Sequence, residues 1–262
     1  MTTPETTHSN RKNAVIVITI LIFGCFVPTY IQSTNWYATL VSDWIYEVRV
    51  LAKPMSRLIL VVLSTWFLLG IHPKQQPRAF GLQPGWRNFA FAIALGVLFS
   101  LPMLIVGLLG GINEDLVLRS LHFKSLGPGF FEEFFFRAFA FGLLVKLAKW
   151  RVWPAAIFTG IIFGLAHVHL SLVQEMNITN QLGWIAVLAA AGAFYAWIYA
   201  SWDFNLWIPI TMHTLLDLCW ALFNMDQSPL GSFGLFASTT LVFMIPSIVT
   251  IRRMKKTKMK SI

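Results

Sequence analysis

Apolar residues gather in long runs along the chain, and shorter polar segments separate them. The runs cover residues 14–34, 54–71, 88–112, 129–150, 153–173, 182–201, 204–223 and 230–251. A helix needs about 20 residues, at a rise of 1.5 Å each, to cross roughly 30 Å of hydrocarbon. Because all eight runs are near that length, the pattern predicts an all-α membrane protein, a bundle of about eight transmembrane helices.

The order of these runs shows no repeat and no break, so we expect a single integral membrane domain over residues 1–262. The first run follows a polar head with Arg11 and Lys12 and continues through Pro28 without a small-residue cleavage site. It therefore predicts an uncleaved first helix and not a removed signal peptide. Arg57 lies near one end of the second run, from where its long side chain can extend to the lipid headgroups.

Composition strengthens the membrane interpretation. Only 12% of residues are charged and 56% are hydrophobic, whereas globular domains carry roughly 25% charged residues. These values exclude disorder, a coiled coil and collagen, and argue strongly against a soluble enzyme. Cys25 and Cys219 both lie inside apolar runs, without a CxxC spacing, and we expect inert core residues.

The net charge of +9 would suggest a nucleic-acid partner in a soluble protein. Here the basic residues flank apolar runs, and cytoplasmic loops retain Lys and Arg. With both termini inside, 14 basic residues fall on the inner side and 5 on the outer side. We therefore expect no nucleic acid, and a multi-pass protein of a prokaryotic cell membrane with both termini cytoplasmic.

A few ionisable residues lie inside the apolar runs, where each costs about 2.5 to 3.5 kcal/mol at a helix centre. In GFFEEFFFRAF, Glu133 and Arg137 are four residues apart and share a helix face. Glu132 points about 100° away. This spacing predicts one paired carboxylate and one available for chemistry, although an ion pair that only locks helix packing remains an alternative.

Two further segments carry histidines. In FTGIIFGLAHVHL, Phe163 and His167 share a face, and the small residues Gly160 and Gly164 allow close approach of another helix. His169 faces away from His167, and we assign it no role.

In NLWIPITMHTLLDLCW, His213 and Asp217 are four residues apart and within contact distance on a helix. Under the topology above, the acids and histidines of the three segments all fall in the outer half of the membrane. Their convergence at one depth is the pattern of a water-accessible intramembrane site.

The three segments resemble the CPBP family, the CAAX-processing and bacteriocin-processing intramembrane proteases also called the Abi family. The EExxxR motif of that family matches Glu132, Glu133 and Arg137, FxxxH matches Phe163 and His167, and HxxxN matches His213 with Asp217. Order and spacing agree over residues 125–220, which we expect to form the catalytic core. The departures are Ala138, where Gly often follows the Arg, and Asp217, where Asn is common.

The resemblance implies an intramembrane endopeptidase without a metal cofactor. Glu132 would act as general base on a water held jointly with His167. His213 and Asp217 would stabilise the oxyanion, Arg137 would hold Glu133 ionised, and Phe163 would line the substrate cavity. The expected partners are a membrane-associated protein or peptide substrate and the lipid bilayer.

Two other classes of protein fit the same residues. A zinc-dependent membrane hydrolase could use Glu132, His167 and His213 as ligands, because two histidines with a glutamate form a known catalytic set. No HExxH segment is present. The other class is a non-proteolytic membrane regulator, scaffold or transporter, in which the buried polar cluster binds a partner or relays protons.

Overall fold

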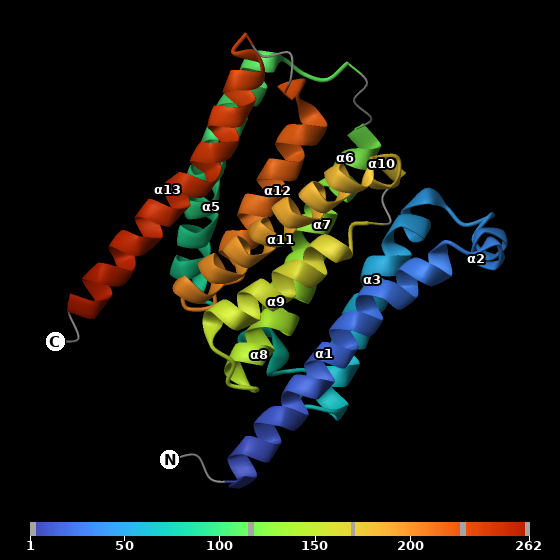
Figure 1. Cartoon of the computed structure of the whole chain (residues 1–262), viewed down its shortest axis with the longest axis vertical. Coiled ribbons are helices and arrows are strands. Elements are labelled where there is room, and N and C mark those ends of the chain that lie inside the picture. Colours follow the sequence, from blue (N-terminus) through green and yellow to red (C-terminus); the bar gives the residue numbers. More distant parts are fainter. Residues whose placement is uncertain (1–3, 115–117, 169–170, 226–228, 260–262) are drawn as a thin grey trace. The chain divides into compact units, whose positions relative to one another are not determined.

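The chain is mostly helical in the residues that the computed structural model describes, 4–114, 118–168, 171–225 and 229–259. Within these ranges, extended pairing is limited to one antiparallel bridge between Ile112 and Phe223. The helices, which Figure 1 colours along the sequence, divide into two compact units. The first unit comprises Met1–Phe80 and Phe134–Ala200, and the second comprises Gly81–Glu133 and Ser201–Ile262.

The helices divide between the two units as follows. The first unit contains α1 (Pro4–Gln32), α2 (Asn35–Leu40), α3 (Tyr46–Phe67), α4 (Gln76–Ala79), the π-helix η1 (Glu133–Phe141), α8 (Gly142–Lys146), α9 (Val152–Leu165), α10 (Ser171–Gln174) and α11 (Ile178–Ser201). The second contains α5 (Trp86–Gly110), α6 (Leu118–Lys124), α7 (Leu126–Glu132), α12 (Trp207–Leu222) and α13 (Gly231–Met259). The boundary residues Glu133 and Ser201 belong to the second unit.

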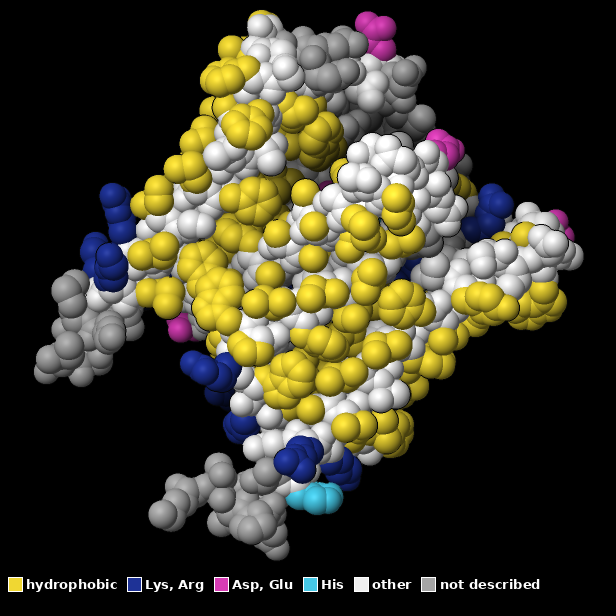
Figure 2. All heavy atoms as spheres, in the orientation of Figure 1, with side chains coloured by type: hydrophobic (Ala, Val, Ile, Leu, Met, Phe, Trp, Pro, Cys, Tyr) yellow, Lys and Arg dark blue, Asp and Glu magenta, His cyan; other side chains and the backbone are white. Residues whose placement is uncertain are grey.

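Among the described residues, five helices are long and apolar enough to cross a membrane: α1, α3, α5, α11 and α13. Five apolar helices of this length indicate an integral membrane protein. Apolar side chains cover much of the helix surface in view, as expected of a chain in contact with lipid (Figure 2). The predicted number of about eight spanning helices stays a prediction, because α9 has 14 residues, α12 has 16, and the 129–150 run divides into α7, η1 and α8.

Arg57 corrects one expectation. Helix α3 begins at Tyr46, well before the apolar run, so that Arg57 lies in its middle and not near its end. Its Nε donates to the carbonyl oxygen of Gly24 on α1, 2.8 Å away. That carbonyl lacks its helical partner because Pro28, four residues later, has no N–H. The prediction that Arg57 lies near one end of its span is therefore wrong, and its guanidinium satisfies a backbone group that proline leaves open.

The close helix approach predicted for Gly160 and Gly164 is confirmed. A Cβ atom added at Gly164 would lie 2.5 Å from the carbonyl oxygen of Ile185, and one added at Gly160 would collide with the carbonyl oxygen of Ala189. Both carbonyls belong to α11. Small residues on α9 thus allow its backbone to contact α11 directly, which is how helices commonly pack in membranes.

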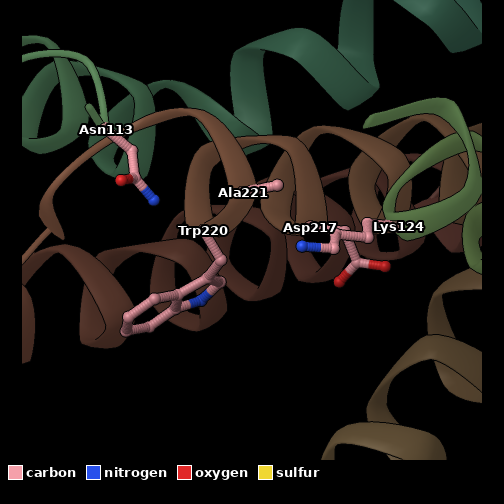
Figure 3. A pocket seen from close by; sticks show the side chains of 5 residues that line it. All are labelled: Asn113, Lys124, Asp217, Trp220 and Ala221. Carbon is pink, nitrogen blue, oxygen red and sulfur yellow. The ribbon is translucent and has the colours of Figure 1, made fainter. Parts of the chain in front are cut away.

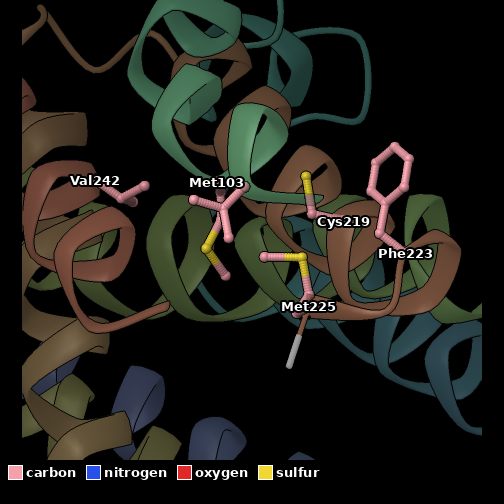
Figure 4. Close-up of a cluster of buried hydrophobic side chains, with 6 residues drawn as sticks. Met103, Cys219, Phe223, Met225 and Val242 are labelled. Carbon is pink, nitrogen blue, oxygen red and sulfur yellow. The ribbon is translucent and has the colours of Figure 1, made fainter. Parts of the chain in front are cut away.

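In the second unit, α5 packs against both α12 and α13. Buried apolar side chains from these helices and the segment after α12 form one cluster (Figure 4), which contains Met103, Val106, Cys219, Phe223, Met225 and Val242. Cys25 and Cys219 are both buried and unbridged, as the sequence predicted.

The beginning of α12 is fixed by backbone contacts to the segment before α5. Gly81 has φ +76°, a conformation that favours glycine, and a Cβ there would collide with the carbonyl oxygen of Phe204. The backbone N–H of Leu206 donates to the Gly81 carbonyl at 3.2 Å, and the indole N–H of Trp207 donates to the Leu82 carbonyl at 3.1 Å. These bonds set the start of the helix that carries His213 and Asp217.

Candidate active site

Helices α7 and α12 approach each other closely at a glycine of α7. A Cβ atom at Gly129 would collide with the hydroxyl oxygen of Thr214 and lie 2.8 Å from the Thr214 backbone nitrogen. The two helices therefore touch one residue along α12 from His213 and one turn before Glu133. This contact explains how residues 80 positions apart in the sequence come together.

Glu133, His213 and Asp217 form one continuous chain of polar contacts in the second unit. The Nδ1 atom of His213 lies 2.7 Å from Oε1 of Glu133, and because a carboxylate only accepts, Nδ1–H donates this hydrogen bond. On the other side of the ring, Nε2 lies 3.4 Å from Oδ2 of Asp217. The predicted contact between His213 and Asp217 is present, whereas the contact between His213 and Glu133 was not predicted.

The exposed fraction of the side chain rises along this chain of contacts, from Glu133 to Asp217. The side chain of Glu133 is fully buried, that of His213 is 16% exposed and that of Asp217 is 28% exposed. The imidazole thus has a buried carboxylate at one nitrogen and a more accessible one at the other. A ring held in this way can donate an N–H to a developing negative charge or carry a proton.

Glu132 is the last residue of α7, and the π-helix η1 begins at the next residue. Unlike its buried neighbour Glu133, Glu132 is half-buried. A π-helical segment is rare and often occurs at functional sites; here it covers nine residues, EFFFRAFAF. The adjacent acids therefore occupy different environments.

Arg137 lies on η1 in the first unit and is 2% exposed. Its guanidinium carbon lies over three aromatic rings, 4.5 Å from the centroid of Phe163, 5.3 Å from Tyr195 and 6.0 Å from Phe136. A desolvated guanidinium over such rings gains about 2 kcal/mol or more in all. Phe163, expected to line a substrate cavity, thus has Arg137 against its ring face.

His167 follows the end of α9 and is half-buried. Its Nδ1 lies 2.7 Å from the backbone carbonyl oxygen of Phe163, so that Nδ1 carries the hydrogen and donates. In the neutral ring, Nε2 then has the lone pair and is an acceptor. The predicted contact with Phe163 is also present, with ring centroids 4.6 Å apart. His169 lies outside the described residues.

The structure thus brings together two sets of predicted residues. Glu133, His213 and Asp217 contact one another in the second unit, and Arg137 and His167 share Phe163 in the first. A water held between Glu132 and His167, and an ion pair between Glu133 and Arg137, stay predictions.

The zinc alternative stays untested. No three or more His, Cys, Asp or Glu side chains are grouped so that they could hold a metal ion in the part of the chain that the structure describes. A catalytic zinc requires three such ligands within about 2.0–2.3 Å of the metal. The ligand set suggested by the sequence joins His167 of the first unit with Glu132 and His213 of the second, and it stays a prediction.

The fold and these residues define a helical membrane protein with acid and histidine chemistry on its helices. Residues 97–219 match the model of a family described as Rce1-like, type II CAAX prenyl endopeptidase. All the site residues predicted from the sequence lie within the matched stretch, so the resemblance to CAAX-processing proteases is confirmed there. A comparison with curated proteins finds no match. The bacteriocin-processing and Abi branch of the resemblance stays a prediction.

Proposed function

We propose that this protein is a glutamate-dependent endopeptidase that hydrolyses peptide bonds of membrane-associated proteins or peptides. The family match supports a CAAX-type endopeptidase. The observation that carries the proposal is the buried Glu133–His213 hydrogen bond of 2.7 Å, with Asp217 at the far nitrogen of the ring. Burying a carboxylate is costly, and this one orients a ring beside a second, less buried acid, Glu132.

In the proposed reaction, Glu132 accepts a proton from a water molecule, and the oxygen of that water forms a bond to the carbonyl carbon of the substrate. His167, with Nδ1–H bonded to the Phe163 carbonyl, accepts a hydrogen bond from the water at Nε2. The carbonyl oxygen becomes an oxyanion. When the tetrahedral intermediate collapses, the C–N bond breaks and Glu132 returns its proton to the leaving amine.

His213 stabilises the oxyanion in this proposal, and its contacts suggest which atom does so. Because Nδ1–H is committed to Glu133, the nitrogen that can face the substrate is Nε2, and it donates to the oxyanion as the second N–H of the protonated ring. The Nε2 contact to Asp217 is 3.4 Å, longer than an ordinary N–H···O bond. Glu133 is then a positioning residue that fixes the ring, a role that buried acids have beside catalytic histidines. Asp217 is a second positioning residue for the same ring.

The experiment that tests this proposal compares cells that produce the wild-type protein with cells that produce Glu132→Gln. We expect membrane peptides or proteins that accumulate uncleaved only in the Glu132→Gln cells. Glu175→Gln is the matched control, because Glu175 is an exposed acid outside the motifs, and its peptide profile should equal that of wild type. If all three profiles agree while a cellular role of the protein persists, the protein is a regulator or scaffold and the proposal fails.

The zinc alternative needs a separate test. Purified protein treated with a chelator and assayed for peptide hydrolysis should retain its turnover. About one zinc per chain, with activity lost on removal and restored on addition, would replace this mechanism with metal-assisted hydrolysis.

A further inference from the structure

Positive charge gathers at the C-terminal end of α13 in the second unit. Arg252, Lys255 and Lys256 are all exposed there, and Lys and Arg side chains are seen together at this end of the helix (Figure 2). They lie in the last turns of a helix that is long and apolar enough to cross a membrane. Because α13 contains no Asp or Glu, these three charges have no acid on their own helix.

Two other cations of the second unit each lie beside an acid. Lys124 lines a pocket of about 320 Å³ together with Asp217 (Figure 3). Arg253, in the same turn as the three exposed residues, donates from Nη2 to Oδ2 of Asp203. The charge of Arg253 is therefore balanced, and the surplus positive charge at this end of α13 is that of Arg252, Lys255 and Lys256.

Arg253 and Trp202 attach the end of α13 to the segment before α12. The guanidinium of Arg253 donates to the carbonyl oxygen of Ser201, and its carbon lies 4.6 Å from the centroid of the Trp202 ring. The indole N–H of Trp202 donates to the hydroxyl oxygen of Thr250 at 2.9 Å. Thr250 and Arg253 are three residues apart and share one face of the helix, so that this face is held by the protein.

The three exposed cations lie on the opposite side of α13. At about 100° per residue, each of them lies about 90° to 170° around the helix from the middle of the face that carries Thr250 and Arg253. The attached face thus fixes the direction in which the opposite face points. The end of α13 presents an ordered cationic surface, formed by Arg252, Lys255 and Lys256.

Tryptophan side chains indicate the depth of this surface in the membrane. Trp202 contacts α13, and its ring centroid lies 5.7 Å from that of Phe91 on α5. Trp86, the first residue of α5, is 76% exposed. Tryptophan is enriched at the level of the lipid headgroups. The basic side chains at this end of α13 therefore lie at the level of the lipid phosphates.

We propose that the C-terminal end of α13 is a binding site for anionic lipid headgroups, in which Arg252, Lys255 and Lys256 contact the phosphate. Guanidinium and ammonium groups form charge-assisted hydrogen bonds with phosphate oxygens. Each basic residue that directly follows a spanning helix raises the affinity for anionic lipid about fivefold. The proposal concerns the lipid partner and goes beyond peptide hydrolysis.

The test counts bound lipids on the purified full chain. Native mass spectrometry in a neutral detergent gives the affinity of the first bound lipid for dioleoylphosphatidylglycerol and for dioleoylphosphatidylcholine, which share their acyl chains and differ in headgroup charge. Detergent removes the direction of membrane insertion from the measurement, since basic residues also influence that direction.

We expect phosphatidylglycerol to bind about tenfold or more tightly than phosphatidylcholine. Removing the three charges together should abolish this preference, because the cationic surface is lost; the variant is Arg252→Gln, Lys255→Gln and Lys256→Gln. Exchanging the same residues with retention of charge should keep the preference; that variant is Arg252→Lys, Lys255→Arg and Lys256→Arg.

A matched control separates a local site from the net charge of the chain. It removes three exposed basic side chains that lie elsewhere, in Arg49→Gln, Lys74→Gln and Lys124→Gln. This control has the same net charge as the variant without the cationic surface. It should keep the preference for phosphatidylglycerol.

Three results would overturn the proposal. Equal affinity of the wild-type protein for the two lipids shows that it does not recognise an anionic headgroup. A preference that survives loss of the cationic surface, in protein of unchanged melting temperature, or that disappears equally in the matched control, removes α13 from the role. A preference that inorganic phosphate abolishes at equal concentration assigns the surface to a free anion. Absence of peptide hydrolysis would contradict the proposed function alone, because lipid binding is measured without it.

Discussion

The two units hold their charged side chains in different ways. In the second unit, His213 contacts Glu133 and Asp217 through charged or polar atoms. In the first unit, the Arg137 guanidinium lies over three aromatic rings, and His167 bonds a backbone carbonyl. The contacts of His213 in the second unit depend on charge, so that a substitution that keeps the size of a side chain but removes its charge can disable them. The contacts of Arg137 in the first unit depend on shape, so that a substitution that keeps the charge but changes the shape can disable them.

The largest effect expected from this contrast is the loss of turnover in the variant His213→Ala. Removing the ring removes the proposed oxyanion donor, and loss of such a donor lowers the rate by about 10²–10³-fold. Turnover of purified protein on a cleaved membrane peptide measures the effect. Asp217→Asn is the comparison, because it keeps the size and an acceptor oxygen beside Nε2. It should lose less than about tenfold, and a loss as large as that of His213→Ala would make Asp217 an equal partner in the chemistry.

Arg137→Lys should lower stability although it keeps the charge. A lysine ammonium is a compact point charge and cannot spread over three rings as a planar guanidinium does. We expect a loss of about 2 kcal/mol in the free energy of unfolding, seen as a lower melting temperature in detergent. Arg151→Lys is the control, since Arg151 is exposed. Equal melting temperatures for the two variants would show that the rings contribute nothing through Arg137.

A smaller effect tests the backbone contact between α1 and α3. Arg57→Ala leaves the Gly24 carbonyl without its donor and should cost about 1–3 kcal/mol. In a Pro28→Ala background, the new backbone N–H of residue 28 can bond that carbonyl, so Arg57→Ala should cost clearly less. A double-mutant cycle of thermal or denaturant unfolding measures the difference. Additive losses would show that Pro28 and Arg57 act separately.

The parts of this structure that were predictable from the sequence are those that local spacing controls. The pairs Phe163 with His167 and His213 with Asp217 are four residues apart on helices, and both contacts are present. The close packing at Gly160 and Gly164 followed from residue size. The two residue pairs depend on the helical repeat alone, and the glycine packing depends on residue size.

The remaining features depend on contacts between distant segments. The Glu133–His213 bond joins residues 80 positions apart, and nothing in the spacing of Glu133 within its own segment indicates that partner. The π-helix has no sequence signature in EFFFRAFAF. Arg57 was misplaced because hydropathy detects apolar runs, and the polar first turns of α3 from Tyr46 onward lie outside such a run.

The central claim is that Glu132 acts as the general base of a peptide hydrolysis. The most direct test is the turnover of purified Glu132→Gln on a peptide that the wild-type protein cleaves, with Glu175→Gln as control. Glutamine keeps the size but cannot accept the proton of the attacking water, so turnover should fall by about 10²-fold or more while the melting temperature stays unchanged. A folded Glu132→Gln protein with wild-type turnover would contradict the account.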